Sequence, residues 1–183
     1  GLPTDVPDPT SVASRFEILQ KYWKHDLYYE SRLVKDKVLV VQMDDGQNKF
    51  WDVQVDKLKA DIEKARNNNY TILIFIHEPI STGNPNDTNV PYLYTGDSGS
   101  ATPADFYKKD VVSPDNGGAT KSVYDLIINN GDVIRGVFTG HLHNDHYTEI
   151  EAKTASGEKV IIPQYTLCGS FYGQGHVMKI TVK

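Results

Sequence analysis

The sequence has little of several features that would place it in a specialised class of protein. Cysteine occurs once, at Cys168, which excludes an internal disulfide framework and a zinc site built from several cysteines. The longest apolar run, residues 70–76, is far shorter than the ~18 residues of a membrane-spanning helix. Lysine and arginine number 19 against 24 aspartates and glutamates, a net charge of −5. We therefore expect neither a membrane span nor nucleic acid as the main partner.

The remaining composition is that of an ordinary globular domain. The chain has 183 residues, of which 39% are hydrophobic and 23% are charged. This length is sufficient for a single domain with a buried core. The chain starts at Gly1, and its only methionines are Met43 and Met178. We therefore expect that a segment upstream of Gly1 has been removed, while the cellular compartment stays open.

The hydrophobic periodicity predicts an α/β chain that ends in antiparallel strands. The strand–helix–strand order in its first half indicates a parallel, right-handed unit. The run 38–43 is nearly all apolar, which is typical of a strand covered on both faces. Residues 81–118 are too polar and too long for a simple connection, so we expect a functional loop or an insertion. The predicted strands are 27–34, 38–43, 70–76, 133–139, 147–152, 159–165 and 177–182, and the predicted helices are 12–23, 52–66 and 121–130, the last capped by Thr120.

Three of the six histidines lie close together, at His141, His143 and His146. This cluster directly follows the predicted strand 133–139, and ligands of parallel sheets bind beyond the carboxyl ends of strands. A His-x-His pair in extended backbone places both imidazoles on one side, as two ligands of a borderline divalent metal require. The alternative is a polar loop with solvated histidines.

A fourth histidine, His77, also directly follows a buried strand, in the sequence His77-Glu78-Pro79. By itself it could be a polar group at the rim of the core. The proline holds the residue before it in an extended conformation. Two histidine sites at the ends of strands in one sheet can converge on one crevice, and this coincidence is the main functional signal of the sequence.

The combination resembles the carboxyl-terminal portion of the calcineurin-like metallophosphoesterases. The resemblance is carried by His77 with Pro79 and, after a later strand, by Gly140-His141-x-His143. It implies a layered α/β/β/α sandwich in which residues 1–183 form the carboxyl-terminal part of one domain. The earlier motifs of the family, Asp-x-His, Gly-Asp and Gly-Asn-His, are absent here as usable motifs. We therefore expect the amino-terminal half of the domain to be missing.

By this resemblance, the parent protein hydrolyses phosphomonoesters or phosphodiesters with two divalent metal ions, Mn, Fe or Zn. His77 and His141 would bind one metal and His143 the other. The two metals activate a water and stabilise the oxygens of an in-line displacement at phosphorus. The substrate would be a phosphorylated small molecule, a nucleotide, a lipid or a protein. With about half of the ligands missing, the chain alone would bind metal weakly and be inactive.

Residues near the histidines could support them, although no catalytic residue is assigned. Asp145 could orient a ligand imidazole or form a turn. Asn144 and Glu78 could contact the ligands or the substrate. His146 could stand near the leaving group as a proton donor, or it could lie behind the ligands or at the surface.

Two other hypotheses stay open for the whole chain. It could be a non-catalytic, histidine-rich metal-binding or interaction module, or a structural α/β domain with incidental histidines. Asp44 and Asp45 follow the strand 38–43 and could approach the crevice, but turn chemistry explains them equally well. A surface exposed by a missing half would favour self-association.

Overall fold

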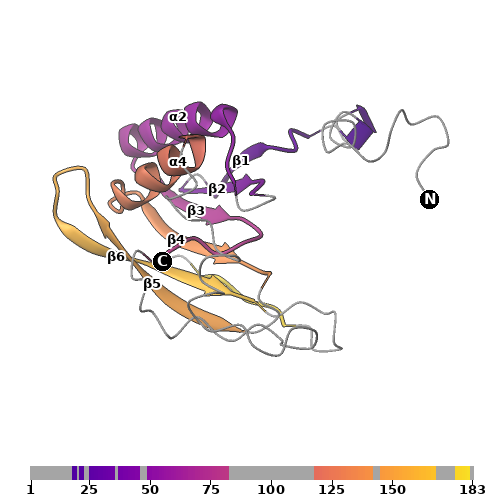
Figure 1. Cartoon of the computed structure of the whole chain (residues 1–183). Coiled ribbons are helices and arrows are strands. Elements are labelled where there is room, and N and C mark those ends of the chain that lie inside the picture. Colours follow the sequence, from indigo (N-terminus) through magenta and orange to yellow (C-terminus); the bar gives the residue numbers. More distant parts are fainter. Residues whose placement is uncertain are drawn as a thin grey trace.

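The computed structural model describes residues 18–19, 21–22, 25–35, 37–45, 49–82, 118–141, 145–167 and 176–181. These residues form a mixed α/β structure with one six-stranded sheet and two helices, which confirms the predicted α/β class (Figure 1). The strands are β1 (Tyr29–Val34), β2 (Val38–Met43), β3 (Thr71–Phe75), β4 (Ile134–Thr139), β5 (His146–Lys153) and β6 (Lys159–Thr166), and the helices are α2 (Asp52–Asn68) and α4 (Gly118–Ile128).

The sheet has the strand order β1-β2-β3-β4-β6-β5. Strands β2, β3, β4 and β6 run parallel, and β1 and β5 pair antiparallel at the two sides. The carboxyl ends of the four parallel strands and the start of β5 therefore meet at one edge, which we call the carboxyl edge. Ligands of such sheets bind at this edge.

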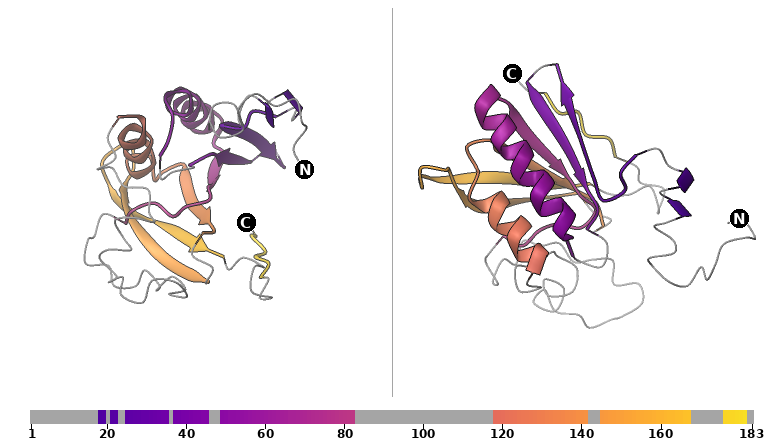
Figure 2. Two further views of the ribbon diagram at one scale, coloured as in Figure 1. Left: turned by 45° about the vertical axis from the view of Figure 1, so that its right-hand side comes forward. Right: turned by 90° about the horizontal axis from the view of Figure 1, so that it is seen from above.

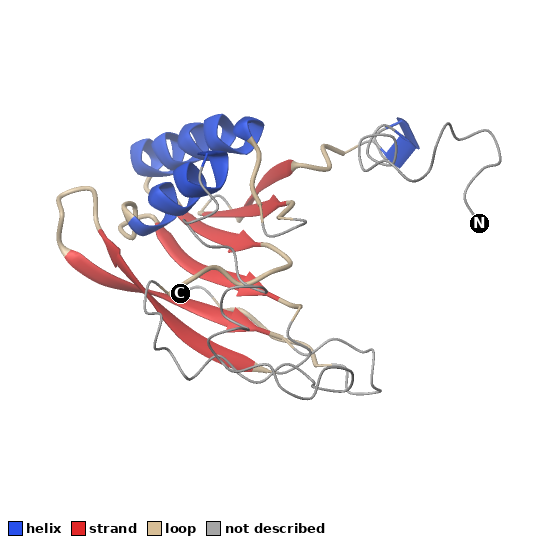
Figure 3. Ribbon diagram, in the orientation of Figure 1, coloured by secondary structure: helices blue, strands red, loops and turns tan. Residues whose placement is uncertain are grey.

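Helices α2 and α4 cover the same face of the sheet. The connections from β2 to β3 and from β3 to β4 step in the same direction across the sheet, so right-handed crossovers place both helices on one side. Figures 2 and 3 show this arrangement from several directions. Neither helix is both long and apolar enough to cross a membrane, and the same holds for every helix in the described residues.

The apolar stripe of α2 forms a large part of the core. Its buried members are Val55, Leu58, Ile62 and Ala65, as the periodicity predicts. Alternate residues of β2 are buried, whereas Val38 and Val40 are half-buried and Gln42 is exposed. The expectation that β2 is covered on both faces is therefore met only in part among the described residues, because both helices pack on the same face.

Three other expected features differ from the structure or lie partly outside it. Thr120 does not cap α4, because the helix begins at Gly118, and its hydroxyl instead accepts the Phe50 N–H at 3.0 Å. Residues 176–181 contain no strand, and Val177 is 97% exposed, so alternation of residue types alone did not create a paired strand. Residues 18–19 and 21–22 are helical, and the rest of the predicted helix 12–23 lies largely outside the described residues.

One buried side chain, Gln54, joins the residues before β1, after β2 and before α2 through hydrogen bonds. Its amide donates to the carbonyls of Tyr28 at 2.7 Å and Asp44 at 2.6 Å. Its oxygen accepts the Trp51 N–H at 2.6 Å. These contacts satisfy an amide that would otherwise be costly to bury, and they fix the backbone immediately before Asp45.

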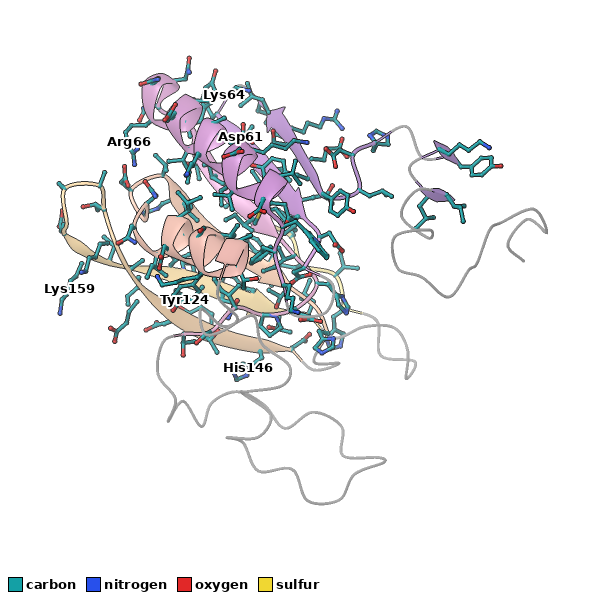
Figure 4. The ribbon with its side chains drawn as sticks, turned by 45° about the horizontal axis from the view of Figure 1, so that its top comes forward. Asp61, Lys64, Arg66, Tyr124, His146 and Lys159 are labelled. Carbon is teal, nitrogen blue, oxygen red and sulfur yellow. The ribbon has the colours of Figure 1, made fainter. Side chains whose placement is uncertain are left out.

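Two further contacts fasten α2 to its neighbours. The Tyr29 hydroxyl donates to Asp61 Oδ2 at 2.7 Å, and burial together with this hydrogen bond raises the pKa of Tyr29. Asp61 and Arg66 are both labelled on α2 in Figure 4. Arg66 donates to the carboxylate of Asp132 from Nε at 3.1 Å and from Nη2 at 3.0 Å. The contact between Tyr29 and Asp61 is buried, whereas the contact between Arg66 and Asp132 is exposed and contributes little to stability.

Candidate functional site

The carboxyl edge brings together the two histidines that follow β3 and β4. His77 Nε2 lies 3.2 Å from His141 Nδ1, and the two rings meet edge to face with centroids 5.1 Å apart. The strands are adjacent and parallel, with Phe75 opposite Phe138, so the residues after them arrive at the same place. The expected convergence of the strand ends is therefore present. The role of these residues as metal ligands stays a prediction.

The backbone around this histidine pair is held in place. The Gly140 N–H donates to the His77 carbonyl at 2.9 Å, which extends the contact between β3 and β4 past the strand ends. His141 has a φ of 66°, in the left-handed region. A non-glycine residue in this region costs of the order of 1–3 kcal/mol, and such strain concentrates at functional sites. His77 is exposed and His141 half-buried, so the pair is accessible to a ligand.

A third residue, Asp45, anchors the segment that carries His77. It is only 1% exposed, and its two oxygens accept the N–H groups of His77 at 3.0 Å and Glu78 at 2.7 Å. The sequence left open whether Asp45 approaches the crevice or only forms a turn, and the structure places it against the backbone of His77 and Glu78. One signal could have shown this: the buried positions of β2 alternate, and Asp45 continues the alternation two residues beyond Met43.

Asp45 is electrostatically unusual for an aspartate. Burial raises its pKa from 3.8 to about 7, although the N–H groups of His77 and Glu78 favour the ionised form. The neighbouring carboxylate of Asp44 raises the pKa of Asp45 further. A cation at the adjacent imidazoles would act in the opposite direction and favour the ionised carboxylate.

The other predicted site residues have different places. Glu78 is buried directly after His77. The carboxylate of Asp145 contacts Nδ1 of His176, a histidine to which the sequence gave no functional role. His146 begins β5, and Figure 4 shows it at the opposite end of the β5–β6 hairpin from Lys159. His143 and Asn144 lie outside the described residues.

Between the histidine pair and β5, the carboxyl edge is formed by the ends of the neighbouring strands β4 and β6. Thr139 and His146 both stand opposite Thr166 in the strand register. The hydroxyls of Thr139 and Thr166 are 2.7 Å apart, and the Leu167 N–H donates to the Thr139 carbonyl at 2.9 Å. The end of β4, the end of β6 and the start of β5 therefore lie side by side, and the end of β4 is two residues before His141.

The spacing of the two imidazoles fits a pair of neighbouring ligands on one divalent cation. With metal–nitrogen bonds of about 2.0–2.1 Å, tetrahedral ligands lie about 3.4 Å apart and octahedral neighbours about 2.9 Å apart. The observed 3.2 Å falls between these values. Among the described residues, no group of three or more His, Cys, Asp or Glu side chains could hold a metal ion. The described residues thus fit two ligands and not a whole site.

Comparison with known proteins gives a distant structural similarity. No protein-family model matches the sequence, and no curated protein does. Among solved structures, a dimetal phosphatase from Danio rerio is similar with a TM-score of 0.47 and 13% sequence identity. The match covers 82% of this chain and 51% of the phosphatase, so the chain spans about half of that protein's length. Similarity at this level assigns neither a family nor an activity to the chain.

Proposed function

We propose that this chain carries part of a two-metal centre that hydrolyses phosphomonoester or phosphodiester bonds. The main support is the contact between His77 Nε2 and His141 Nδ1 at the carboxyl edge. These nitrogens would bind one divalent cation, and His143 would bind a second. When bound, two such cations supply the Lewis acidity that activates a water and stabilises the oxygens of an in-line displacement at phosphorus. The remaining ligands would come from outside the described residues.

The two imidazoles can bind a cation only when the nitrogens that face each other carry no proton. A proton on either of these facing nitrogens would have to move to the other nitrogen of its own ring when the cation enters, so cation binding would select one tautomer of each imidazole. Asp45 holds the backbone of His77, so the segment that carries the imidazole is already ordered before binding.

A second candidate function is a metal-binding module without catalysis. It is favoured by one observation, that no third ligand joins His77 and His141 among the described residues. Such a module would bind a cation through the same pair, but it would lack the second cation that in-line displacement at phosphorus uses. Hydrolysis, and not metal binding, therefore separates the two candidates.

The test is metal analysis and hydrolysis of bis(4-nitrophenyl) phosphate by the intact protein in the presence of Mn²⁺. The first proposal expects bound metal and turnover that is lost in both His77→Ala and His141→Ala. His25→Ala is the matched control, because His25 is an exposed histidine whose Nδ1 lies 3.3 Å from Glu30 of β1, a strand that is separated from β3 by β2. Bound metal without turnover would favour the binding module. Absence of both metal and turnover would contradict both candidates.

A further inference from the structure

A hollow lies on the carboxyl edge, at the start of β5 and the end of β6. It is a cleft of about 640 Å³, and Tyr147 of β5 and Tyr165 of β6 are among the residues that line it. The segment 176–178 forms part of the same lining through His176 and Met178. No residue of this cleft belongs to the histidine pair described above.

The cleft lies within reach of the histidine pair. Strand β6 is the neighbour of β4, and β5 is the neighbour of β6. Adjacent strands are about 4.8 Å apart, so the ends of β6 and β5 lie about 5 and 10 Å from the end of β4. His141 follows that end by two residues. A group attached directly to a phosphate at His77 and His141 could therefore occupy the cleft.

The ring of Tyr147 is a preorganised surface in this cleft. It is 45% exposed, and its ring centroid lies 5.2 Å from that of Tyr165. Its hydroxyl donates to Glu149 Oε1 at 3.0 Å, which restrains the ring from the other end. Tyr165 in turn stacks on Phe138 with centroids 5.6 Å apart. Because the ring is already restrained, a ligand that contacts Tyr147 loses little free energy in ordering this side chain.

A side-chain contact holds the segment 176–178 next to the start of β5. The imidazole Nδ1 of His176 meets the carboxylate of Asp145, directly before the first residue of β5. This contact fixes the start of the segment that carries Met178. Met178 adds a thioether, which packs favourably against aromatic rings. The described lining includes Asp145 and no lysine or arginine, so it is poorly suited to a phosphate group.

We propose that this cleft binds the aromatic group of an aryl phosphoester whose phosphate lies at His77 and His141. The proposal rests on the proposed function for the position of the phosphate. Tyr147, Tyr165 and Met178 offer ring faces and a polarisable sulfur, and aromatic ligands pack on such groups in offset or edge-to-face geometry. Tyr147 is thus a residue that determines specificity.

The test compares the binding of phenyl phosphate and inorganic phosphate to the Zn²⁺-loaded chain by NMR titration. We expect phenyl phosphate to bind about two- to tenfold more tightly than inorganic phosphate, the range of an aromatic contact. Tyr147→Leu should remove this preference, and Tyr147→Phe should keep it because the ring remains. Tyr22→Leu is the control, because Tyr22 is an exposed tyrosine that does not line the cleft.

The outcomes separate this proposal from the proposed function. Equal affinity for the two phosphates, no binding of either, or a preference that survives in Tyr147→Leu would overturn the cleft proposal. A Zn²⁺ titration without phosphate reports on the histidine pair alone. If Zn²⁺ does not bind but phenyl phosphate still binds in a manner that depends on Tyr147, the cleft is supported and the metal centre is contradicted.

Discussion

Asp45 and His77 are joined by a hydrogen bond in which a buried carboxylate accepts a backbone N–H at 3.0 Å. The second oxygen of the same carboxylate accepts the N–H of Glu78 at 2.7 Å. The carboxylate follows β2 and the two N–H groups follow β3, so one side chain connects the ends of two adjacent strands. The position of the backbone that carries the His77 imidazole therefore depends on a residue that is 32 positions earlier in the chain.

Asp45→Asn should weaken metal binding while the chain remains folded. An asparagine has one oxygen and one NH₂ group, so it can accept only one of the two N–H groups and opposes the other. Loss of such a supporting contact costs about 10- to 100-fold in metal affinity. Zn²⁺ titration calorimetry measures the effect. Asp44→Asn is the matched control, because Asp44 contacts the indole of Trp51 and not the backbone of His77. Equal affinities in the two variants would contradict this role of Asp45.

Asp45 should also give the metal-free protein a characteristic pH dependence. Its pKa is about 7 in the folded chain against 3.8 without the fold, so the folded state binds the proton more tightly. The stabilisation is complete below about pH 3.8 and is lost as pH rises to about 7, on the order of 4 kcal/mol in total. Urea denaturation in EDTA across this range measures it. The difference between wild type and Asp45→Asn isolates this group, and a difference that does not vary with pH would refute the shift.

Because His141 has a left-handed backbone, we expect the residue to bind metal at the expense of folding stability. With a φ of 66°, glycine should be favoured over alanine at this position by about 1 kcal/mol. His141→Gly should therefore unfold at higher urea than His141→Ala, while both lose Zn²⁺ binding. Asn69, with a φ of 57° at the end of α2, is a matched site where the same comparison should give the same sign. If His141→Ala is the more stable variant, the backbone strain is not present in solution.

The buried hydrogen bond from Tyr29 to Asp61 should contribute to stability and not to metal binding. Tyr29→Phe leaves the Asp61 carboxylate without its 2.7 Å donor, which should cost about 1–3 kcal/mol of unfolding free energy. The double variant with Asp61→Leu should recover part of this loss, because both polar groups are then gone. Denaturation measures both effects. Altered Zn²⁺ affinity in Tyr29→Phe would show that the contact influences the site.

The features that sequence could predict are those that depend on local pattern. The stripe of α2 and the buried β3 follow from periodicity, and His77 and His141 follow from the rule that ligands gather at carboxyl strand ends. The alternation of β2 could have separated the buried Asp45 from Asp44, but the N–H groups that Asp45 accepts could not be predicted, because they depend on which strand lies beside β2. The contact between Asp145 and His176 spans 31 residues and has no local signal. The predicted strand 177–182 failed for the same reason, because pairing needs a partner.

We propose above all that His77 and His141 together hold a divalent cation. The most direct measurement is a Zn²⁺ titration of wild type, His77→Ala, His141→Ala and the control His25→Ala by calorimetry. We expect the wild type and His25→Ala to bind Zn²⁺ with the same affinity. Both site variants should lose at least the ~10- to 100-fold that removal of a supporting residue costs. Wild-type affinity in either site variant, or no Zn²⁺ binding by the wild type, would contradict the claim.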